Sequence, residues 1–507
     1  MLPFWILFSL TLGVCSGAVS VEPLPPIPYV ERPVEIQVAY PTPWMPAPDV
    51  DSTFIFGTVG TGSAKLSING SPVQVAPNGA FLAFLPMPED RRFRLVAIKD
   101  GRRYGHTFSY LPPERETKTR DTRTVFEPFD PARSAVVTGG QDTLATGSEI
   151  KFASPEPGAD RRWFFPKGSR LEVTGRRGDL LSVRLTDKTT AWMDTSLVTF
   201  VDDDIRPEGG GHVSLHSSGR STDVTIPAGY APFLIDPRSN EVLVTVYGRD
   251  IGLEEVEAKD MEMVSSVAWT SSTPDSSVLR IVLREALWGY KAFYEPDGNL
   301  VVRLRRAPEL DPGMPFKGVK ILIDPGHPPG GAIGPTGLRE PEANLAISLD
   351  LARMLRERGA EVVLTRTTPE PMVSETDDAQ ELWRRVAYAV EEDVDLLVSV
   401  HNNAFPEGTN PFLNYGTEVY YYHPFSESLA RVLACEIAGV TGLPHLGAKR
   451  RSLALVRPTW MPSVLTESVF LMFPEQEEAL RDRAFVARLA AAHARGIEAF
   501  LRQWIRV

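Results

Sequence analysis

The feature that most constrains this chain of 507 residues is a change of hydrophobic period near residue 319. From there to the C-terminus, short apolar runs alternate with amphipathic segments of helical length. Strand–helix alternation calls for an open, mostly parallel sheet covered by helices, so the sequence predicts an α/β domain over residues 317–507. The expected strands are 319–324, 361–365, 394–400, 417–422, 453–456 and 463–467, and the expected helices are 342–357, 377–391, 427–440 and 474–504.

The first of these helices shows the spacing of a core-facing stripe. Its apolar residues recur every three or four positions, which places them on one side of a helix. The stripe that we expect to face the sheet consists of Leu345, Leu349, Ala352 and Leu355.

The residues upstream of 317 follow the period of short strands. Hairpin-turn signals such as Asn69-Gly70 separate the alternating runs. The first predicted module resembles an immunoglobulin-like domain and the second an SH3-like barrel. The sequence thus predicts a multidomain chain with a proline-rich linker at residues 19–48, followed by three small all-β modules at 49–113, 134–203 and 210–308.

The N-terminus carries the pattern of an export signal. Residues 4–14 form an apolar run too short to span a bilayer, and small residues precede a cleavage point after Ala18. We expect residues 1–18 to be a signal peptide, so that the mature chain is extracytoplasmic and has no transmembrane anchor. Lipidation of Cys15 is a weaker alternative, because Val14 stands where a small residue is expected.

The overall charge excludes one class of partner. The formal net charge is -12 at pH 7, so the chain lacks the basic excess that neutralises phosphates. We therefore expect no nucleic-acid binding. A local basic run, Lys449-Arg450-Arg451, is either a contact for a substrate carboxylate or a solvated surface run.

Chemically useful side chains gather at the ends of the predicted strands. Ligands bind at the carboxyl ends of strands in such sheets, and two predicted strands end close to His327 and His401. A later strand ends at Glu467, and Glu340 stands just before the first helix. Each residue alone has an ordinary structural explanation, such as a helix-start carboxylate that complements the dipole. Four of them reaching one edge of a sheet instead predict a functional site.

This set of residues suits zinc chemistry. Two histidines and one carboxylate form a known catalytic zinc set that leaves a fourth position for water. Zn²⁺ lowers the pKa of that water to about 7 and polarises a carbonyl, and a further carboxylate handles the proton. Glu342 is a rival for the carboxylate ligand. The expected ligands are His327, Glu340 and His401, and the expected general base is Glu467.

The motifs around these residues resemble a known family. They read ILIDPGH at 321–327, LREPEANLAI at 338–347, LTR at 364–366, DLLVSVHNNA at 395–404, GTEVYYY at 416–422 and PSVLTESVF at 462–470. In this order they are similar to the third family of zinc-dependent N-acetylmuramoyl-L-alanine amidases. The resemblance implies hydrolysis, in peptidoglycan, of the amide between the lactyl group of N-acetylmuramic acid and L-alanine. It also implies Zn²⁺ as the cofactor, with the ligands and the base named above.

Two departures from the family pattern lie next to the site. Pro328 and Pro329 stand where glycines usually follow the first histidine, and Pro341 replaces the lysine that usually follows the ligand glutamate. Both changes leave the metal set whole. They concern the shape of the cleft and the packing around it.

The β modules fit an exported enzyme of this kind. The module at 210–308 is similar to the targeting modules that precede wall amidases. The module at 134–203 is either a barrel that docks the enzyme on the wall or a spacer with a buried Trp192.

Two alternatives to an active amidase follow from the same residues. One is a wall-binding protein with an inactive amidase domain, and the other is a zinc peptidase that cuts a different peptide bond of the wall. An intact base at Glu467 favours activity, because an idle copy has no need of it. The sequence names no protein activator.

Overall fold

The computed structural model describes residues 23–43, 45–111, 125–140, 143–146, 152–153, 162–202, 212–252, 255–256, 262–373 and 378–505. The predicted signal peptide, with Cys15, lies outside the described residues. Within the described ranges, none of the helices combines the length and hydropathy that crossing a bilayer demands.

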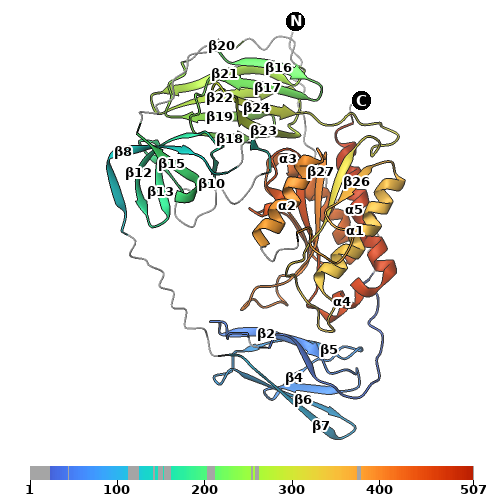
Figure 1. Cartoon of the computed structure of the whole chain (residues 1–507). Helices are drawn as coiled ribbons and strands as arrows, with labels where there is room; N and C mark the ends of the chain where they lie inside the picture. Colours follow the sequence, from blue (N-terminus) through green and yellow to red (C-terminus); the bar gives the residue numbers. More distant parts are fainter. Residues whose placement is uncertain are drawn as a thin grey trace.

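The N-terminal β sandwich (residues 37–111) consists of two sheets (Figure 1). One has the order β1 (Gln37–Tyr40), β2 (Ser52–Thr58) and β5 (Ala80–Pro86); the other has the order β4 (Ser71–Val73), β3 (Lys65–Ile68), β6 (Arg92–Lys99) and β7 (Arg102–Ser109). Asn69 and Gly70 join β3 to β4 with φ of 49° and 84°, the conformation that this hairpin turn requires. The predicted turn is confirmed, and the sandwich begins before residue 49 because β1 pairs with β2.

The β strands between residues 127 and 305 form further antiparallel sheets. The first has the order β14 (Thr189–Asp194), β13 (Leu180–Thr186), β12 (Arg170–Arg177), β8 (Glu127–Val137), β15 (Val198–Val201). The second has the order β16 (Ser214–Ser218), β17 (Ser221–Ile226), β24 (Leu300–Arg305), β23 (Gly289–Tyr294), β9 (Thr143–Leu144). The third has the order β18 (Phe233–Pro237), β19 (Glu241–Tyr247), β22 (Ser276–Leu283), β21 (Val264–Thr273), β20 (Glu255–Val256), and β10 (Phe152–Ala153) pairs with β11 (Trp163–Phe164).

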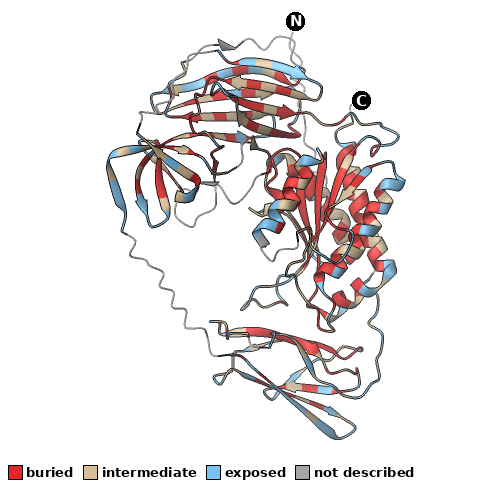
Figure 2. Cartoon of the chain, viewed as in Figure 1, coloured by how far each residue is buried: buried red, intermediate tan, exposed pale blue. Residues whose placement is uncertain are grey.

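Buried and less buried residues alternate along strands such as β17 and β19, so one face of each covers a core (Figure 2). The strand β9 lies in the predicted module 134–203 but pairs with β23, so the two neighbouring modules share a sheet. The expectation of a buried Trp192 was wrong. Trp192 is only half-buried, because it lies on the opposite face of β14 from Ala191 and Met193, which belong to the core.

The C-terminal α/β domain has a six-stranded sheet of order β26 (Glu361–Leu364), β25 (Lys320–Pro325), β27 (Leu396–Asn403), β30 (Ser463–Phe470), β28 (Thr417–Tyr421), β29 (His445–Arg450). Neighbouring strands are parallel except β28 and β30, which are antiparallel. The helices are α1 (Glu340–Glu357), α2 (Asp378–Glu391), α3 (Pro424–Thr441), α4 (Pro474–Arg481) and α5 (Arg483–Arg502). Strands and helices thus alternate as the sequence predicts, with α1, α3 and α5 packed on one side of the sheet.

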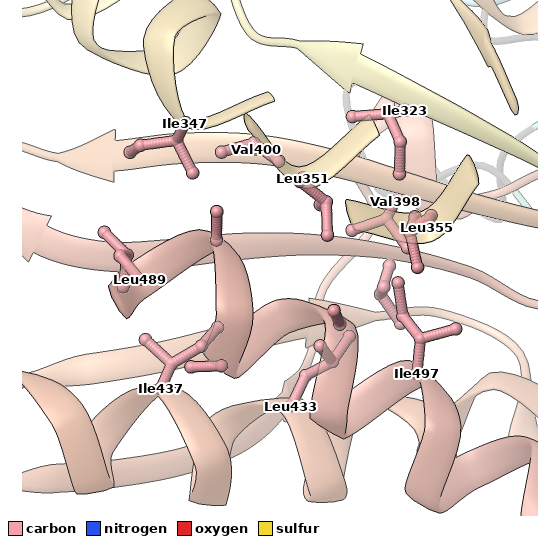
Figure 3. Close-up of a cluster of buried hydrophobic side chains, with 14 of the residues drawn as sticks. Ile323, Ile347, Leu351, Leu355, Val398, Val400, Leu433, Ile437, Leu489 and Ile497 are labelled. Carbon is pink, nitrogen blue, oxygen red and sulfur yellow. The ribbon is translucent and has the colours of Figure 1, made fainter. Parts of the chain in front are cut away.

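The main core lies between that side of the sheet and its three helices (Figure 3). The contributing side chains are Ile323, Val398 and Val400 from the strands, Ile347, Leu351 and Leu355 from α1, Leu433 and Ile437 from α3, and Leu489 and Ile497 from α5. A smaller core on the opposite side joins Leu322 and Leu397 to Val386 and Ala389 of α2.

Three local expectations were wrong. Leu349 is 41% exposed, because the buried stripe of α1 runs four residues apart through Ile347, Leu351 and Leu355. Residues 454–456 form a 3₁₀ turn, and the edge strand is β29 instead. The predicted helix at 474–504 is two helices, because Asp482 is extended (φ -75°, ψ 117°) and its carboxylate caps α5 by accepting from the Phe485 amide.

The strands β25, β27 and β30 of the α/β sheet begin along one side of the sheet, called here the amino edge, and end along the opposite side, the carboxyl edge. At the carboxyl edge, the parallel strands β25, β27 and β30 end next to one another. At the amino edge, where β25 and β27 begin, the domain is joined to β23 and β24. Arg305 of β24, 3% exposed, donates to the Asp395 carboxylate at 3.2 Å, and the Trp288 indole donates to the Asp395 carbonyl at 2.9 Å. A Cβ on Gly289 would lie 2.2 Å from the Trp460 carbonyl oxygen, so glycine is required for this approach.

Candidate metal centre

Three potential metal ligands meet at the carboxyl edge. His327 follows β25, His401 lies near the end of β27, and Glu340 begins α1. One donor atom from each lies within 4.8 Å of the others, and this is the one such group of histidine and acidic residues found in the described part of the chain. Nε2 of His327 is 3.3 Å from Glu340 Oε2, and Nδ1 of His401 is 3.1 Å from Glu340 Oε1.

The backbone next to His327 is shaped around both imidazoles. His327 itself has φ of 58°, an uncommon conformation that histidine tolerates better than most residues. Its Nδ1 lies 3.0 Å from the Pro329 carbonyl oxygen. That carbonyl can only accept, so the proton of a neutral ring sits on Nδ1 and the lone pair of Nε2 is directed into the site. A Cβ on Gly326 would lie 2.3 Å from the His401 ring, which explains the glycine of the DPGH motif.

Two buried arginines fix the loop that carries His327. Arg385 of α2 donates to the carbonyl oxygens of Pro325, His327 and Pro328 at 2.8–3.0 Å. It also donates to the Asp324 carboxylate at 2.9 Å.

Arg366, which follows β26, donates to the carbonyl oxygens of Pro325, Gly326 and Pro341 at 2.8–3.0 Å. Burial, with the nearby charge of Arg385, lowers the pKa of Arg366 to about 10. The loop is therefore held through its backbone by rigid guanidinium groups, which position the imidazole of His327.

Asp324 is a buried carboxylate below the site. Burial alone would raise its pKa, but Arg385 and the hydroxyl groups of Ser399 and Thr365 outweigh that effect and lower it. Asp324 therefore stays ionised as the counter-charge of Arg385. It is not a member of the ligand group.

Glu340 is 4% exposed and fully engaged. Its Oε2 accepts from the Ala332 amide at 2.8 Å, and its Oε1 accepts from the Asn402 amide and the Asn344 side chain, both at 3.2 Å. Burial would raise the pKa of Glu340, but His327 and His401 reverse the shift and lower it well below the usual value. Glu342, the sequence-based rival, is exposed and lies outside the group.

Glu467 stands beside His401 on the next strand. The two residues are register partners between β27 and β30, so their side chains leave the same face of the sheet. Its Oε2 atom is buried and has no hydrogen-bond partner among the described residues. Burial, with the negative charges of Glu340 and Glu418, raises the pKa of Glu467 well above the usual value.

Glu418 is a site residue that sequence reasoning missed. It is the register partner of Glu467 on β28, and it is buried. Asn403 donates to it at 2.9 Å, and Tyr420 and Lys449 are also bonded to its carboxylate. The GTEVYYY motif contains Glu418, but only the pairing of β28 with β30 places Glu418 beside Glu467. Lys449 of the basic run is thus paired with a carboxylate of the protein.

The donor set fits a divalent cation. Glu340, Glu418 and Glu467 bring three carboxylates together, while Lys449 is the cation that pairs with one of them. A dication would neutralise the excess negative charge and give a charged partner to the buried oxygen of Glu467. Two imidazole nitrogens and one carboxylate are the ligands that Zn²⁺ accepts in catalytic sites.

Comparison with known proteins identifies the family of this domain. Residues 321–499 match the family model described as N-acetylmuramoyl-L-alanine amidase. Over 187 residues the chain is 31% identical to the N-acetylmuramoyl-L-alanine amidase CwlM of Bacillus licheniformis, covering 35% of this chain and 67% of that one. The chain belongs to the N-acetylmuramoyl-L-alanine amidase family.

Other relatives match a similar share of the chain. The uncharacterized protein YqiI of Bacillus subtilis is 30% identical over 207 residues, or 39% of this chain and 93% of that protein. Among solved structures, the N-acetylmuramoyl-L-alanine amidase AmiC2 of Nostoc punctiforme is 30% identical with a TM-score of 0.32, covering 37% of this chain and 99% of that one. The β structures before residue 307 lie outside the family match.

Proposed function

We propose that the amidase domain binds Zn²⁺ through His327, Glu340 and His401 and cuts peptidoglycan. The bond is the amide between the lactyl group of N-acetylmuramic acid and L-alanine. The observation that carries the proposal is the convergence of these three donors beside the buried, unpartnered oxygen of Glu467. Zn²⁺ in such a site supplies a Lewis acid that activates water and polarises a carbonyl.

Glu467 acts as the general base and then as the general acid. It accepts a proton from the attacking water and delivers it to the nitrogen of L-alanine, which leaves as a free amine. The carbonyl carbon of the lactyl group gains the oxygen of that water as its bond to nitrogen breaks, and the group becomes a carboxylate. Glu467 must be ionised to begin this cycle. The positive charge of a cation in the same site favours that form and opposes the effect of burial on its pKa.

The location follows from the substrate. Peptidoglycan lies outside the cytoplasm, and the apolar run at residues 4–14 supports an export signal at 1–18. We further propose that the β structures at 134–203 and 210–308, which share a sheet through β9 and β23, contact the wall as one unit.

The test is digestion of purified sacculi by the zinc-loaded protein. We expect free stem peptides and intact glycan strands. Glu467→Gln keeps the size of the side chain and should lower the rate by roughly 10²–10⁴-fold with zinc content unchanged. Glu436→Gln, a change in the Glu436–Arg495 ion pair of α3 and α5, is the matched control and should leave the rate unaltered.

Each alternative gives a different result. A zinc peptidase would release peptides that lack L-alanine, and L-alanine would stay attached to the glycan strands. An inactive domain would bind sacculi without releasing anything. Equal rates for the wild type and Glu467→Gln would refute the catalytic role of Glu467.

A further inference from the structure

The N-terminal β sandwich has one sheet that is buried on both faces. Along β2, Ile55 belongs to the core of the sandwich, whereas Phe54 and Phe56 belong to a separate cluster shared with the amidase domain. Along β5, Phe81 and Ala83 face the sandwich core, whereas Leu82 belongs to the shared cluster. Successive strand residues point to opposite faces, so β1, β2 and β5 together present an apolar surface to the amidase domain.

The amidase side of this cluster comes from three loops, together with Phe470 at the end of the strand β30 that precedes the third loop. Ile333 lies on the loop between His327 and Glu340, Phe405 and Tyr415 lie on the loop after His401, and Phe470, Met472 and Phe473 follow Glu467. Phe405 stacks on Phe470 with ring centroids 4.3 Å apart. Every strand that brings a proposed ligand or the base to the carboxyl edge is therefore followed by a segment that packs on the sandwich.

Polar contacts fix the relative position of the two surfaces. The Glu407 carboxylate accepts from the Thr53 hydroxyl at 2.9 Å and from the Tyr40 hydroxyl. A Cβ on Gly408 would lie 2.8 Å from the Val50 side chain, so the loop and the sandwich are in close contact there.

A further polar contact lies at α4. Asn78 donates to Glu478 at 3.1 Å. The preceding Glu477 accepts from the amides of Thr336 and Leu338 at 2.9–3.0 Å, which ties α4 to the loop between His327 and Glu340. Both ends of the interface thus reach loops that border the metal centre.

We propose that the N-terminal β sandwich is a positioning element of the metal centre, and that Phe54, Phe56 and Glu407 are positioning residues for the amidase reaction. Packing on all three loops restricts their movement and keeps the ligands close to the geometry that binds the cation. The sandwich is in this respect part of the catalytic unit. The inference rests on the proposed zinc site at His327, Glu340 and His401.

The test compares two neighbouring substitutions on β2 in the full-length protein. Phe54→Ala removes a ring from the shared cluster, whereas Ile55→Val alters the opposite face of the same strand. We expect Phe54→Ala to weaken zinc affinity by roughly 10-fold, in the range seen when groups that orient metal ligands are removed. It should lower kcat more than KM on sacculi. Ile55→Val should leave zinc affinity and kcat within twofold of the wild type.

Glu407 provides a second test that does not disturb a core. Glu407→Ala removes the acceptor of Tyr40 and Thr53, whereas Glu407→Gln retains one. We expect a several-fold weaker zinc affinity for Glu407→Ala and a partial rescue for Glu407→Gln. Zinc affinity is measured by competition with a chromogenic chelator, and circular dichroism confirms that each variant is folded.

Wild-type zinc affinity and kcat in both Phe54→Ala and Glu407→Ala would overturn the inference. So would a change in KM alone, which would indicate a substrate contact, or a higher kcat, which would indicate an inhibitory cap. Loss of the proposed function would look different. In that case the wild type itself would release no stem peptides or bind no zinc, before any variant is compared with it.

Discussion

Buried arginines lie at both the amino and the carboxyl edge of the amidase sheet, but those at one edge connect two domains and those at the other hold a loop of the metal centre. At the amino edge, Arg305 comes from β24 and its partner Asp395 belongs to the amidase domain, so the pair joins two parts of the chain. At the carboxyl edge, Arg366 and Arg385 come from the amidase domain and donate to the backbone of the loop that carries His327. One edge therefore serves the junction between domains, and the other serves the geometry of the site.

The largest expected effect at the amino edge follows from Arg305→Ala. The substitution removes one of the two guanidinium groups that contact the buried Asp395, whereas Arg220 remains 2.8 Å from the carboxylate. We therefore expect a loss at the lower end of the cost of breaking a buried pair, about 3 kcal/mol. The free energy of unfolding, from urea titration, should fall by that amount, while zinc affinity should stay at the wild-type value.

Arg303→Ala is the matched control for that experiment. Arg303 lies on the same strand and pairs with Asp223 at 2.7 Å, but its side chain is 40% exposed. Exposed pairs contribute less than about 1 kcal/mol. Equal losses for the two variants would show that the junction does not depend on the buried pair.

Acid should weaken the same junction. His423 is buried, lies against Tyr290 of β23 and donates from Nε2 to the Arg457 carbonyl at 2.9 Å. Burial, together with the charges of Arg450 and Arg457, lowers the pKa of His423 to about 4. The folded protein thus keeps this ring neutral over a range in which the unfolded chain protonates it.

The stabilisation from His423 is therefore complete above pH 6.5 and is lost as the pH falls from there to about 4. Its full size is on the order of 3 kcal/mol. His423→Gln should flatten the dependence of the urea midpoint on pH. Burial lowers the pKa of His493 in α5 to about 4 as well, so part of the dependence should persist until His493→Gln is added. An unchanged slope in the double variant would contradict this account.

The last and most local effect, on metal binding, should come from Arg385→Lys at the carboxyl edge. Lysine keeps the charge beside Asp324, but its three donors on one nitrogen cannot span the carboxylate and the three loop carbonyl groups that the guanidinium of Arg385 reaches. We expect zinc affinity to fall by about 10–100-fold, measured by chelator competition. Arg384→Lys, at the adjacent half-buried position that pairs with Glu391 at 2.7 Å, should have no effect.

The sequence was informative where chemistry follows directly from strand order. The period change predicts the α/β domain, and the carboxyl ends of parallel strands must meet, so His327, His401 and Glu467 could be expected at one edge. The sequence already favoured Glu340 over its rival Glu342, but the reason for the preference is visible only in the structure. Both lie in the first turn of α1, and only the direction of the helix decides which of them faces the histidines.

Other features depend on contacts that no local pattern encodes. Glu418 lies beside Glu467 because β28 inserts antiparallel to β30, next to a strand that comes later in the chain. Leu349 and Ile347 both fit a helical spacing, so the pattern alone permits two overlapping stripes. The apolar runs at residues 53–56 and 80–85 indicate strands covered on both faces, but they do not name the surface that covers them.

The doubly covered sheet also has a consequence for how the protein is made. Tyr40 and Glu407 are 367 residues apart in sequence, so the sandwich is synthesised long before the loops that cover it. At roughly 5–20 residues per second this interval lasts on the order of 20–70 s. Throughout that time Phe54 and Phe56 lack the surface that covers them in the folded protein, which leaves the newborn sandwich open to wrong association until the last third of the chain arrives.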